Sequence, residues 1–105
     1  MTFKRKGRYF VYIVRCKDGT YYTGYTPDLG KRLKTHNAGK GARYTKYRRP
    51  VRLVWHKEYS YFKPAFLMEK RIKTLTRKQK KMLVKGRPLG KVLRDAGRTK
   101  QRFDS

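Results

Sequence analysis

Apolar residues run together in some parts of this chain and alternate with polar ones in others. Residues 9–16 (YFVYIVRC) carry aromatic and β-branched side chains at both odd and even positions, which predicts a strand covered on both faces. Lys17-Asp18-Gly19 is typical of a turn, and residues 20–25 form a second β-prone run. The two runs therefore predict a β-hairpin.

The register of this hairpin depends on the length of its turn. A two-residue turn places Tyr12 and Tyr22 on opposite faces of the sheet. A three-residue loop with Gly19 at positive φ places both tyrosines on one face, with Gly24 directly across from Tyr12. In that register Gly24 leaves open space above the strand, where a phosphate could approach.

A helix is predicted over residues 27–37. Thr26 is the expected N-cap, followed by a proline at the first helical position and an acid near the positive end of the helix dipole. Arg32 and His36 lie four residues apart beside a stripe of two leucines, so they can reach one target together.

The rest of the chain predicts one more strand and two more helices. Val51, Leu53 and Trp55 alternate with Arg52, Val54 and His56, which is typical of a strand. These elements follow a basic loop and cover residues 51–59, 63–75 and 76–85. We expect a small α+β domain, with a three-stranded, mostly antiparallel sheet flanked by helices, over residues 1–85. Residues 86–105 are expected to form a basic, mobile tail.

Charge sets the class of partner. The 105 residues include 31 Lys and Arg against six Asp and Glu, a formal net charge of +25, and so positive a surface favours nucleic acid as the partner. No long uncharged apolar run or signal-peptide segment is present, so we expect no membrane span. The single Cys16 is expected to be a buried hydrophobe in a reducing compartment, which favours a cytoplasmic protein and a monomer without disulfides.

Several short motifs occur in a fixed order along the chain. They are Phe10-Val11-Tyr12, Tyr22-Thr23-Gly24, Arg32 with His36, GKGARYT at residues 39–45, RPVRLV at residues 49–54, and Glu69. In this order and spacing the chain resembles the GIY-YIG nuclease family, and in particular its small stand-alone branch, over residues 9–84. The resemblance favours the hairpin register with both tyrosines on one face.

The resemblance implies metal-assisted hydrolysis of a phosphodiester bond. Tyr12 would deprotonate the attacking water, Tyr22 and His36 would position water and phosphate, and Arg32 would stabilise developing charge. Glu69 would be the ligand of Mg²⁺ or Mn²⁺. A tyrosine with an ordinary pKa of about 10 is a poor base at pH 7, so we expect the cationic surroundings to lower the pKa of Tyr12.

Each of these side chains also has a simpler interpretation. The two tyrosines could be packing residues, Arg32 a solvated surface charge, and His36 a helix-end histidine that interacts with the dipole. Glu69 borders the apolar stripe of the predicted second helix, where an acid must pair with a cation or bind a metal. A structural pair with an arginine therefore stays open for Glu69. His56 matches no motif of the family, and we expect it to be structural.

The basic loop over residues 39–49 is the expected nucleic-acid contact. Its cations are interleaved with Tyr44 and Tyr47, which suits stacking on bases or contact with a phosphate backbone. The residues expected to bind nucleic acid, DNA in preference to RNA, are Gly24, Lys40, Arg43, Tyr44, Lys46, Arg48 and Arg49. Two other functions stay open: a non-catalytic nucleic-acid-binding protein with this fold, and a peripheral membrane protein that uses Met82, Leu83 and Val84.

Overall fold

The computed structural model describes residues 6–104, with side chains described for residues 7–97. The chain divides into two compact units, of which the first runs to Lys73 and the second begins at Thr74. Each unit is described by itself below. The domain boundary predicted at residue 85 stays a prediction.

The first unit contains a three-stranded antiparallel sheet in the order β2-β1-β3. Its strands are β1 (Lys6–Arg15), β2 (Tyr21–Thr26) and β3 (Arg52–Tyr61). Central strand β1 is buried through residues 11–14, as the continuous apolar run predicts for a strand covered on both faces. The predicted α+β class with a three-stranded sheet and flanking helices is confirmed.

The hairpin has the three-residue loop. Cys16 N donates to Thr20 O at 2.8 Å and Gly19 has φ of 85°, a left-handed conformation that glycine adopts without strain. Tyr12 therefore pairs with Gly24, and the tyrosine at position 22 pairs with Val14. The predicted register is confirmed, and both site tyrosines lie on one face of the sheet. Cys16 is buried with a free thiol, as predicted.

Strand β3 departs from the predicted alternation. Leu53 pairs with Val14 and Trp55 pairs with Ile13, which leaves Val54 as an extra residue between them. Because adjacent residues of β1 point to opposite faces, this β-bulge places Leu53 and Trp55 on opposite faces as well. The regular alternation predicted for this strand is therefore interrupted at Val54, since a period of two does not allow for an inserted residue.

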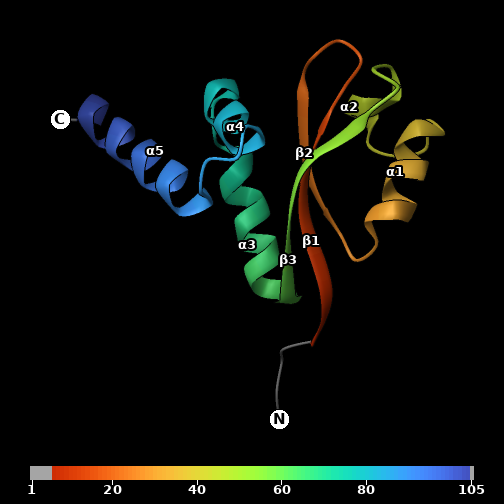
Figure 1. Ribbon diagram of the computed structural model, residues 1–105, viewed down its shortest axis with the longest axis horizontal. Helices are drawn as coiled ribbons and strands as arrows, with labels where there is room; N and C mark the ends of the chain where they lie inside the picture. The colour runs from red at the N-terminus through yellow and green to blue at the C-terminus, as the bar shows by residue number, and fades with distance from the viewer. Residues whose placement is uncertain (1–5, 105) are drawn as a thin grey trace. The chain divides into compact units, whose positions relative to one another are not determined.

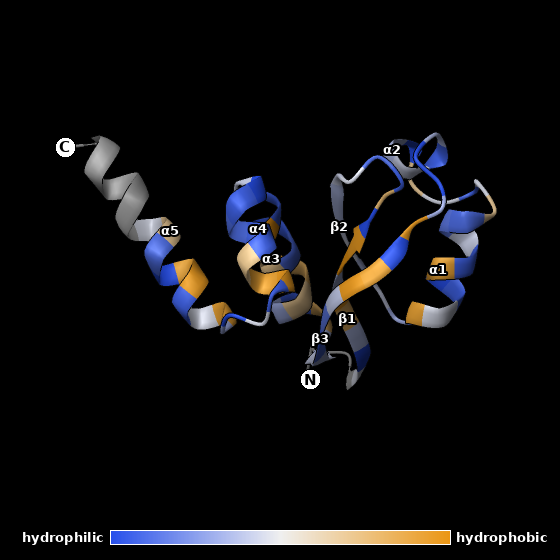
Figure 2. Ribbon diagram, turned by 45° about the horizontal axis from the view of Figure 1, so that its top comes forward, coloured by the Kyte–Doolittle hydropathy of each residue, from blue (hydrophilic) through white to orange (hydrophobic). Residues whose placement is uncertain are grey.

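Helices lie on both sides of this sheet (Figure 1). They are α1 (Leu29–Asn37) on one side and α3 (Phe62–Lys73) on the other, with α2 (Arg43–Lys46) in the loop that precedes β3. Apolar positions interrupt the otherwise hydrophilic ribbon of α1 in Figure 2. Leu29 and Leu33 of this helix pack against the buried cluster that includes Tyr12 and Val14 of β1. The short helix α2 occupies part of the loop predicted to be irregular.

The start of α1 differs from its prediction. Asp28 is the N-cap, because its carboxylate accepts a hydrogen bond from Lys31 N at 3.0 Å. Thr26 instead accepts from Asp28 N at 3.1 Å and shapes the turn before the helix. Either residue type can cap a helix, and the choice between two candidates two residues apart depends on the backbone path out of β2.

Asn37 connects the end of α1 to the beginning of β3. Its side-chain Oδ1 accepts from Val51 N at 2.7 Å, and its Nδ2 donates to Val51 O at 3.1 Å. The amide thus pairs with Val51 as a neighbouring strand would. This pair closes the base of the loop that carries α2.

The second unit contains α4 (Arg77–Val84) and α5 (Leu89–Asp104), which contact each other. Thr76 caps α4 with a complete capping box. The sequence predicts a mobile tail from residue 86, and its mobility stays a prediction; in the structure this segment contains α5, whose Val92 and Leu93 are 2% and 7% exposed. Two adjacent apolar residues, with Leu89 one turn earlier, bury enough surface to organise a turn of helix between glycines.

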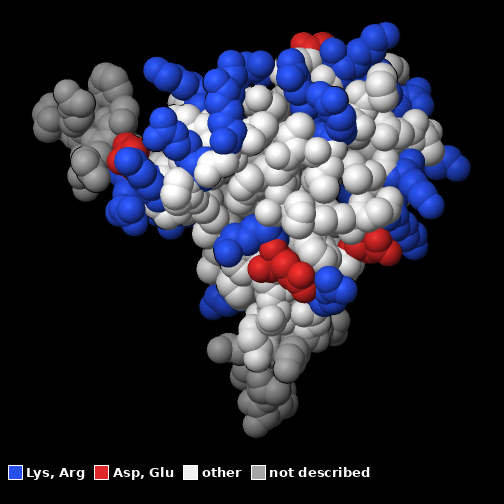
Figure 3. Space-filling model, viewed as in Figure 1, with Lys and Arg blue, Asp and Glu red and all other residues white. Residues whose placement is uncertain are grey.

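The surface is strongly cationic. On the face drawn in Figure 3, Lys and Arg side chains are widely distributed and acidic groups occur at only a few places. Among residues 6–104, the structure contains no helix that combines the length and apolar character needed to cross a membrane.

Candidate active site

Tyr12 lies on β1 and directs its ring across the neighbouring strand. A Cβ atom at position 24 would lie 2.6 Å from the Tyr12 hydroxyl oxygen and 2.8 Å from its Cζ. Gly24 is therefore the residue that lets the tyrosine ring lie against β2. The space predicted for a phosphate above Gly24 is occupied by the Tyr12 ring, so that expectation is wrong.

The Tyr12 hydroxyl is hydrogen-bonded to a buried histidine. Tyr12 Oη lies 2.9 Å from His36 Nε2, and His36 Nδ1 lies 2.7 Å from Thr45 Oγ1. The Thr45 hydroxyl donates its one proton to Ala42 O at 3.0 Å, so it must accept from His36 Nδ1. With the proton on Nδ1, Nε2 of the neutral ring is an acceptor, and Tyr12 donates to it.

Two residues that position His36 are not among the predicted site residues. Thr45 is 0% exposed and fixes the tautomer of the histidine. Gly41 passes so close to α1 that a Cβ atom there would lie 2.9 Å from the backbone Cα of His36. Both lie in the GKGARYT segment, yet nothing in their residue types marks a contact with a helix that ends before them.

The second tyrosine of the site is part of a stack of side chains. The Tyr22 ring lies edge-on to His36, with centroids 5.5 Å apart, and stacks on Tyr44 with centroids 6.0 Å apart. The Arg48 guanidinium carbon lies 4.0 Å from the centroid of the Tyr44 ring, and its Nε donates to Asp18 at 3.1 Å. The stack therefore extends from the histidine to the hairpin loop and restricts the Tyr22 ring.

Arg32 is half-buried on α1, one turn before His36. Its positive charge is close enough to oppose protonation of His36 and to favour ionisation of Tyr12. The predicted proximity of these three side chains is therefore found. A guanidinium at this position suits an anionic ligand such as a phosphate.

Glu69 reaches the same region from α3. Its side chain is 12% exposed, and Oε2 lies 3.1 Å from Lys73 Nζ, one turn further along the helix. Its negative charge is close enough to oppose ionisation of Tyr12. The cation that accompanies Glu69 is thus a half-exposed lysine rather than an arginine, and such a pair between neighbouring turns is weak.

The pKa values of the tyrosine and the histidine are both shifted in the direction that opposes proton transfer from Tyr12 to His36. Burial raises the pKa of Tyr12, and the neighbouring Tyr22 raises it further. The prediction of a lowered pKa is wrong, because loss of hydration outweighs the favourable charge of Arg32. Burial also lowers the pKa of His36, and Arg32 lowers it further, so the imidazole is held neutral.

The donor set around Glu69 fits a weakly held hard cation. Among the described residues no three His, Cys, Asp or Glu side chains gather into a site that could enclose a metal ion. A single carboxylate is nevertheless compatible with Mg²⁺, which retains waters and often relies on substrate phosphate oxygens. Glu69 is the residue that would hold it, after release from Lys73.

The basic loop residues fall into two groups. Arg48 and Arg49 are engaged by the protein: Arg48 by Asp18 and Tyr44, and Arg49 by the carbonyl oxygens of Lys46 and Asn37 at 2.9 and 3.3 Å. The other predicted cations are exposed to solvent and face no acidic partner in a described ion pair; they are Lys40, Arg43 and Lys46.

Known proteins with similar sequences are small. The chain is 51% identical over 76 residues to the UPF0213 protein YazA of Bacillus subtilis, which covers 72% of this chain and 77% of that protein. It is 50% identical over 80 residues to the UPF0213 protein SH2523 of Staphylococcus haemolyticus, covering 76% of this chain and 98% of that one.

The chain is also similar to two solved structures of small proteins. The solution NMR structure of the UPF0213 protein BH0048 from Bacillus halodurans matches with a TM-score of 0.50 and 45% identity, over 74% of this chain and 83% of that one. The NMR structure of EF2693 from E. faecalis matches with a TM-score of 0.54 and 38% identity, over 78% and 88%. The family model described as the GIY-YIG catalytic domain matches residues 8–82. With this match over the sheet, α1 and Glu69, the chain belongs to the GIY-YIG family as a small stand-alone member.

Proposed function

We propose that the protein is a metal-dependent nuclease that hydrolyses phosphodiester bonds of nucleic acid, DNA in preference to RNA. The observation that carries this proposal is the hydrogen-bonded chain from Tyr12 through His36 to Thr45. It joins a tyrosine hydroxyl to a neutral histidine with a fixed tautomer, an arrangement suited to moving a proton. Family membership supports the choice of a phosphodiester as substrate.

In this proposal Tyr12 is the base that activates water. Its oxygen accepts a proton from the attacking water while its own proton passes to His36 Nε2, so the products of this step are hydroxide and an imidazolium ion. Hydroxide then attacks phosphorus, the bond to the leaving oxygen breaks, and that oxygen takes up a proton from solvent. Thr45 holds the histidine in the tautomer that can receive the proton.

The substrate itself would make this transfer favourable. The charge of Arg32 opposes the imidazolium form of His36, but this charge would be neutralised when Arg32 pairs with a phosphate oxygen. The negative charge of the phosphate would also favour the imidazolium. Arg32 thus both stabilises charge that develops on the phosphate and makes proton transfer dependent on bound substrate.

Glu69 would hold Mg²⁺ or Mn²⁺, which when bound supplies positive charge to the leaving oxygen. Tyr22, held by the stack on Tyr44, would position the phosphate or the water with its hydroxyl. The exposed cations Lys40, Arg43 and Lys46 would contact the phosphate backbone, in keeping with a net charge of +25. We further propose that the protein acts as a monomer in the cytoplasm, in keeping with the free, buried thiol of Cys16.

A non-catalytic nucleic-acid-binding protein is the second candidate function. The observation that favours it is the ion pair between Glu69 and Lys73, because a lysine can take the place of a metal ion beside the carboxylate. The same surface charge would serve either function. Strand cleavage therefore decides between them.

A nicking assay tests the proposed nuclease. The purified protein should nick plasmid DNA or cleave oligonucleotides in the presence of Mg²⁺ or Mn²⁺ and not in EDTA. The Tyr12→Phe and Arg32→Ala variants should not cleave either substrate. Tyr9→Phe on the same strand and Lys31→Ala on the same helix are matched controls that should cleave normally. If the wild-type protein cleaves no substrate with either metal, the nuclease proposal fails and the non-catalytic nucleic-acid-binding function replaces it.

A further inference from the structure

Tyr47 is the most exposed of the large apolar side chains that the structure describes, at 79%. Lys46 places its Nζ 5.5 Å from the centroid of the Tyr47 ring. Single exposed aromatic residues are common on protein surfaces and need no function. A function for Tyr47 can therefore be argued only from the groups that surround its ring.

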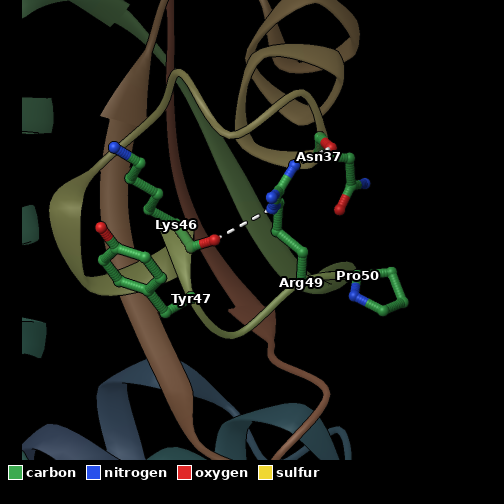
Figure 4. A pocket seen from close by; sticks show the side chains of 5 residues that line it. All are labelled: Asn37, Lys46, Tyr47, Arg49 and Pro50. Atoms are coloured by element: carbon green, nitrogen blue, oxygen red, sulfur yellow. Dashed lines mark hydrogen bonds between the residues drawn. The ribbon is translucent and has the colours of Figure 1, made fainter.

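The Tyr47 ring borders a depression of about 570 Å³. Figure 4 shows its lining, with Arg49 extending between the main chains of Asn37 and Lys46. A volume of this order accommodates a small planar ligand. Two of the five lining residues carry positive charge and none carries negative charge, so an anionic ligand is favoured.

The Arg49 side chain is held in place before any ligand arrives. Its Nε donates to Lys46 O at 2.9 Å and its Nη1 to Asn37 O at 3.3 Å. Gly39 allows this placement, because a Cβ atom there would lie 2.9 Å from Nη1. A guanidinium fixed in this way loses little conformational entropy when it binds a phosphate oxygen.

The remaining polar group of the lining is already committed. Both atoms of the Asn37 amide pair with the backbone of Val51. The depression therefore offers an aromatic face and cations but little to read the hydrogen-bonding edge of a base. Such a site binds by stacking and charge, which is tolerant of base identity.

The depression adjoins the candidate active site through α2. Tyr44 and Thr45 contact Tyr22 and His36 respectively, and the next two residues along the chain line the depression. A nucleotide held there would lie on the part of the loop that also fixes the catalytic histidine.

We propose that this depression binds an unpaired nucleotide of the substrate, with its base stacked on Tyr47 and its flanking phosphates paired with Lys46 and Arg49. The identity of the ligand rests on the proposed action on nucleic acid. A fully paired duplex keeps its bases inside the helix and offers no face to Tyr47. The site therefore favours substrates with a bulge, an overhang or a single-stranded segment.

Binding in EDTA tests this site without cleavage. Three oligonucleotides of equal length are compared by fluorescence anisotropy: a perfect duplex, a duplex with one unpaired adenine, and the same bulge with an abasic residue. The wild-type protein should bind the unpaired adenine about five-fold or more tighter than either control. Tyr47→Ala should remove that preference and change duplex affinity less than two-fold, whereas Tyr47→Phe, which keeps a stacking face, should retain it.

Leu67→Ala, at an exposed apolar residue on α3, is a matched control that should behave as wild type. Equal preference for the unpaired adenine in wild type and Tyr47→Ala would overturn the proposal, as would equal affinity for the adenine bulge and the abasic bulge. These results are independent of strand cleavage. A protein that never cuts but loses its bulge preference in Tyr47→Ala would fail as a nuclease and keep this site.

Discussion

The two halves of the candidate site are held in different ways. Tyr12 and His36 are 2% and 1% exposed and are joined to Thr45 by hydrogen bonds, whereas Glu69 is restrained by one ion pair to a half-exposed lysine. Buried hydrogen bonds hold side chains in one arrangement, while an ion pair whose lysine is half-exposed is more easily exchanged because water can solvate the released ammonium. In the proposed mechanism, the tyrosine half would be preorganised for proton transfer, and the glutamate half would exchange Lys73 for the metal ion.

The largest effect is expected when Glu69 is replaced, because cleavage should be lost while the stability of the fold is kept. Glu69→Ala should reduce Mg²⁺-dependent cleavage at least about 100-fold, while denaturant unfolding shows a stability within about 1 kcal/mol of wild type, because Lys73 can be solvated. Glu58→Ala, which removes an exposed glutamate paired with Arg8, should leave cleavage unchanged. A loss of about 3 kcal/mol or more in Glu69→Ala would instead identify a structural buried pair.

Crowding the histidine tests the preorganised half. Gly41→Ala should destabilise the fold by about 2 kcal/mol, since its Cβ would press against the His36 backbone and ring and a packed backbone yields little. Gly30→Ala in α1 is the matched control, because its Cβ would meet nothing closer than 3.7 Å, and it should stabilise by about 0.5 kcal/mol. Equal unfolding midpoints for the two variants would show that Gly41 has room to move.

Acid should lower the stability of the fold through His36, which belongs to the tyrosine half. Burial lowers the pKa of His36 in the folded state, so the unfolded chain binds the proton first and stability falls as pH drops below the ordinary pKa of histidine, about 6.5. Urea unfolding between pH 8 and 5 should show this decline. His36→Gln should flatten it, whereas His56→Gln, at an exposed histidine, should retain it; a decline that persists in His36→Gln would assign it to other groups.

The smallest effect is expected at the lysine. Lys73→Gln removes the cation that competes for Glu69, so the Mg²⁺ concentration for half-maximal cleavage should fall about two- to five-fold, the range of a surface ion pair. Lys70→Gln, at the neighbouring turn with its ammonium over Phe66, is the control that should leave this concentration unchanged. A higher requirement for Mg²⁺ in Lys73→Gln would mean that the lysine helps to place the carboxylate.

The first strand could be predicted from a local pattern, the β-prone run of residues 9–16. The hairpin register could not be chosen from the residues alone: the glycine at position 19 permits the three-residue loop, and the family resemblance favoured it. The bulge at Val54 and the helix α5 were not predicted. Both depend on packing between segments rather than on periodicity within one.

The site divides in the same way. The tyrosines, arginine, histidine and glutamate of the site could be proposed from spacing and family resemblance. Thr45 and Gly41 could not, because each contacts a histidine that the sequence does not place beside it. The pairing of Lys73 with Glu69 follows from their spacing of four residues on one predicted helix, although the sequence analysis did not name it. The direction of the Tyr12 pKa was also wrong from sequence. Composition reports the charge of the surroundings, whereas the depth of burial, which dominates here, comes only from the fold.

The close approach of Tyr12 to Gly24 has a consequence for sequence change. Because a Cβ at position 24 would overlap the Tyr12 hydroxyl, the two positions form one unit of selection: a larger residue at position 24 is compatible only with a shorter one at position 12. A library randomised at both positions and sorted for folded protein should show this anticorrelation, while sorting for cleavage should return the original pair. The missing side chain of Gly24 thus provides the space that the Tyr12 ring occupies.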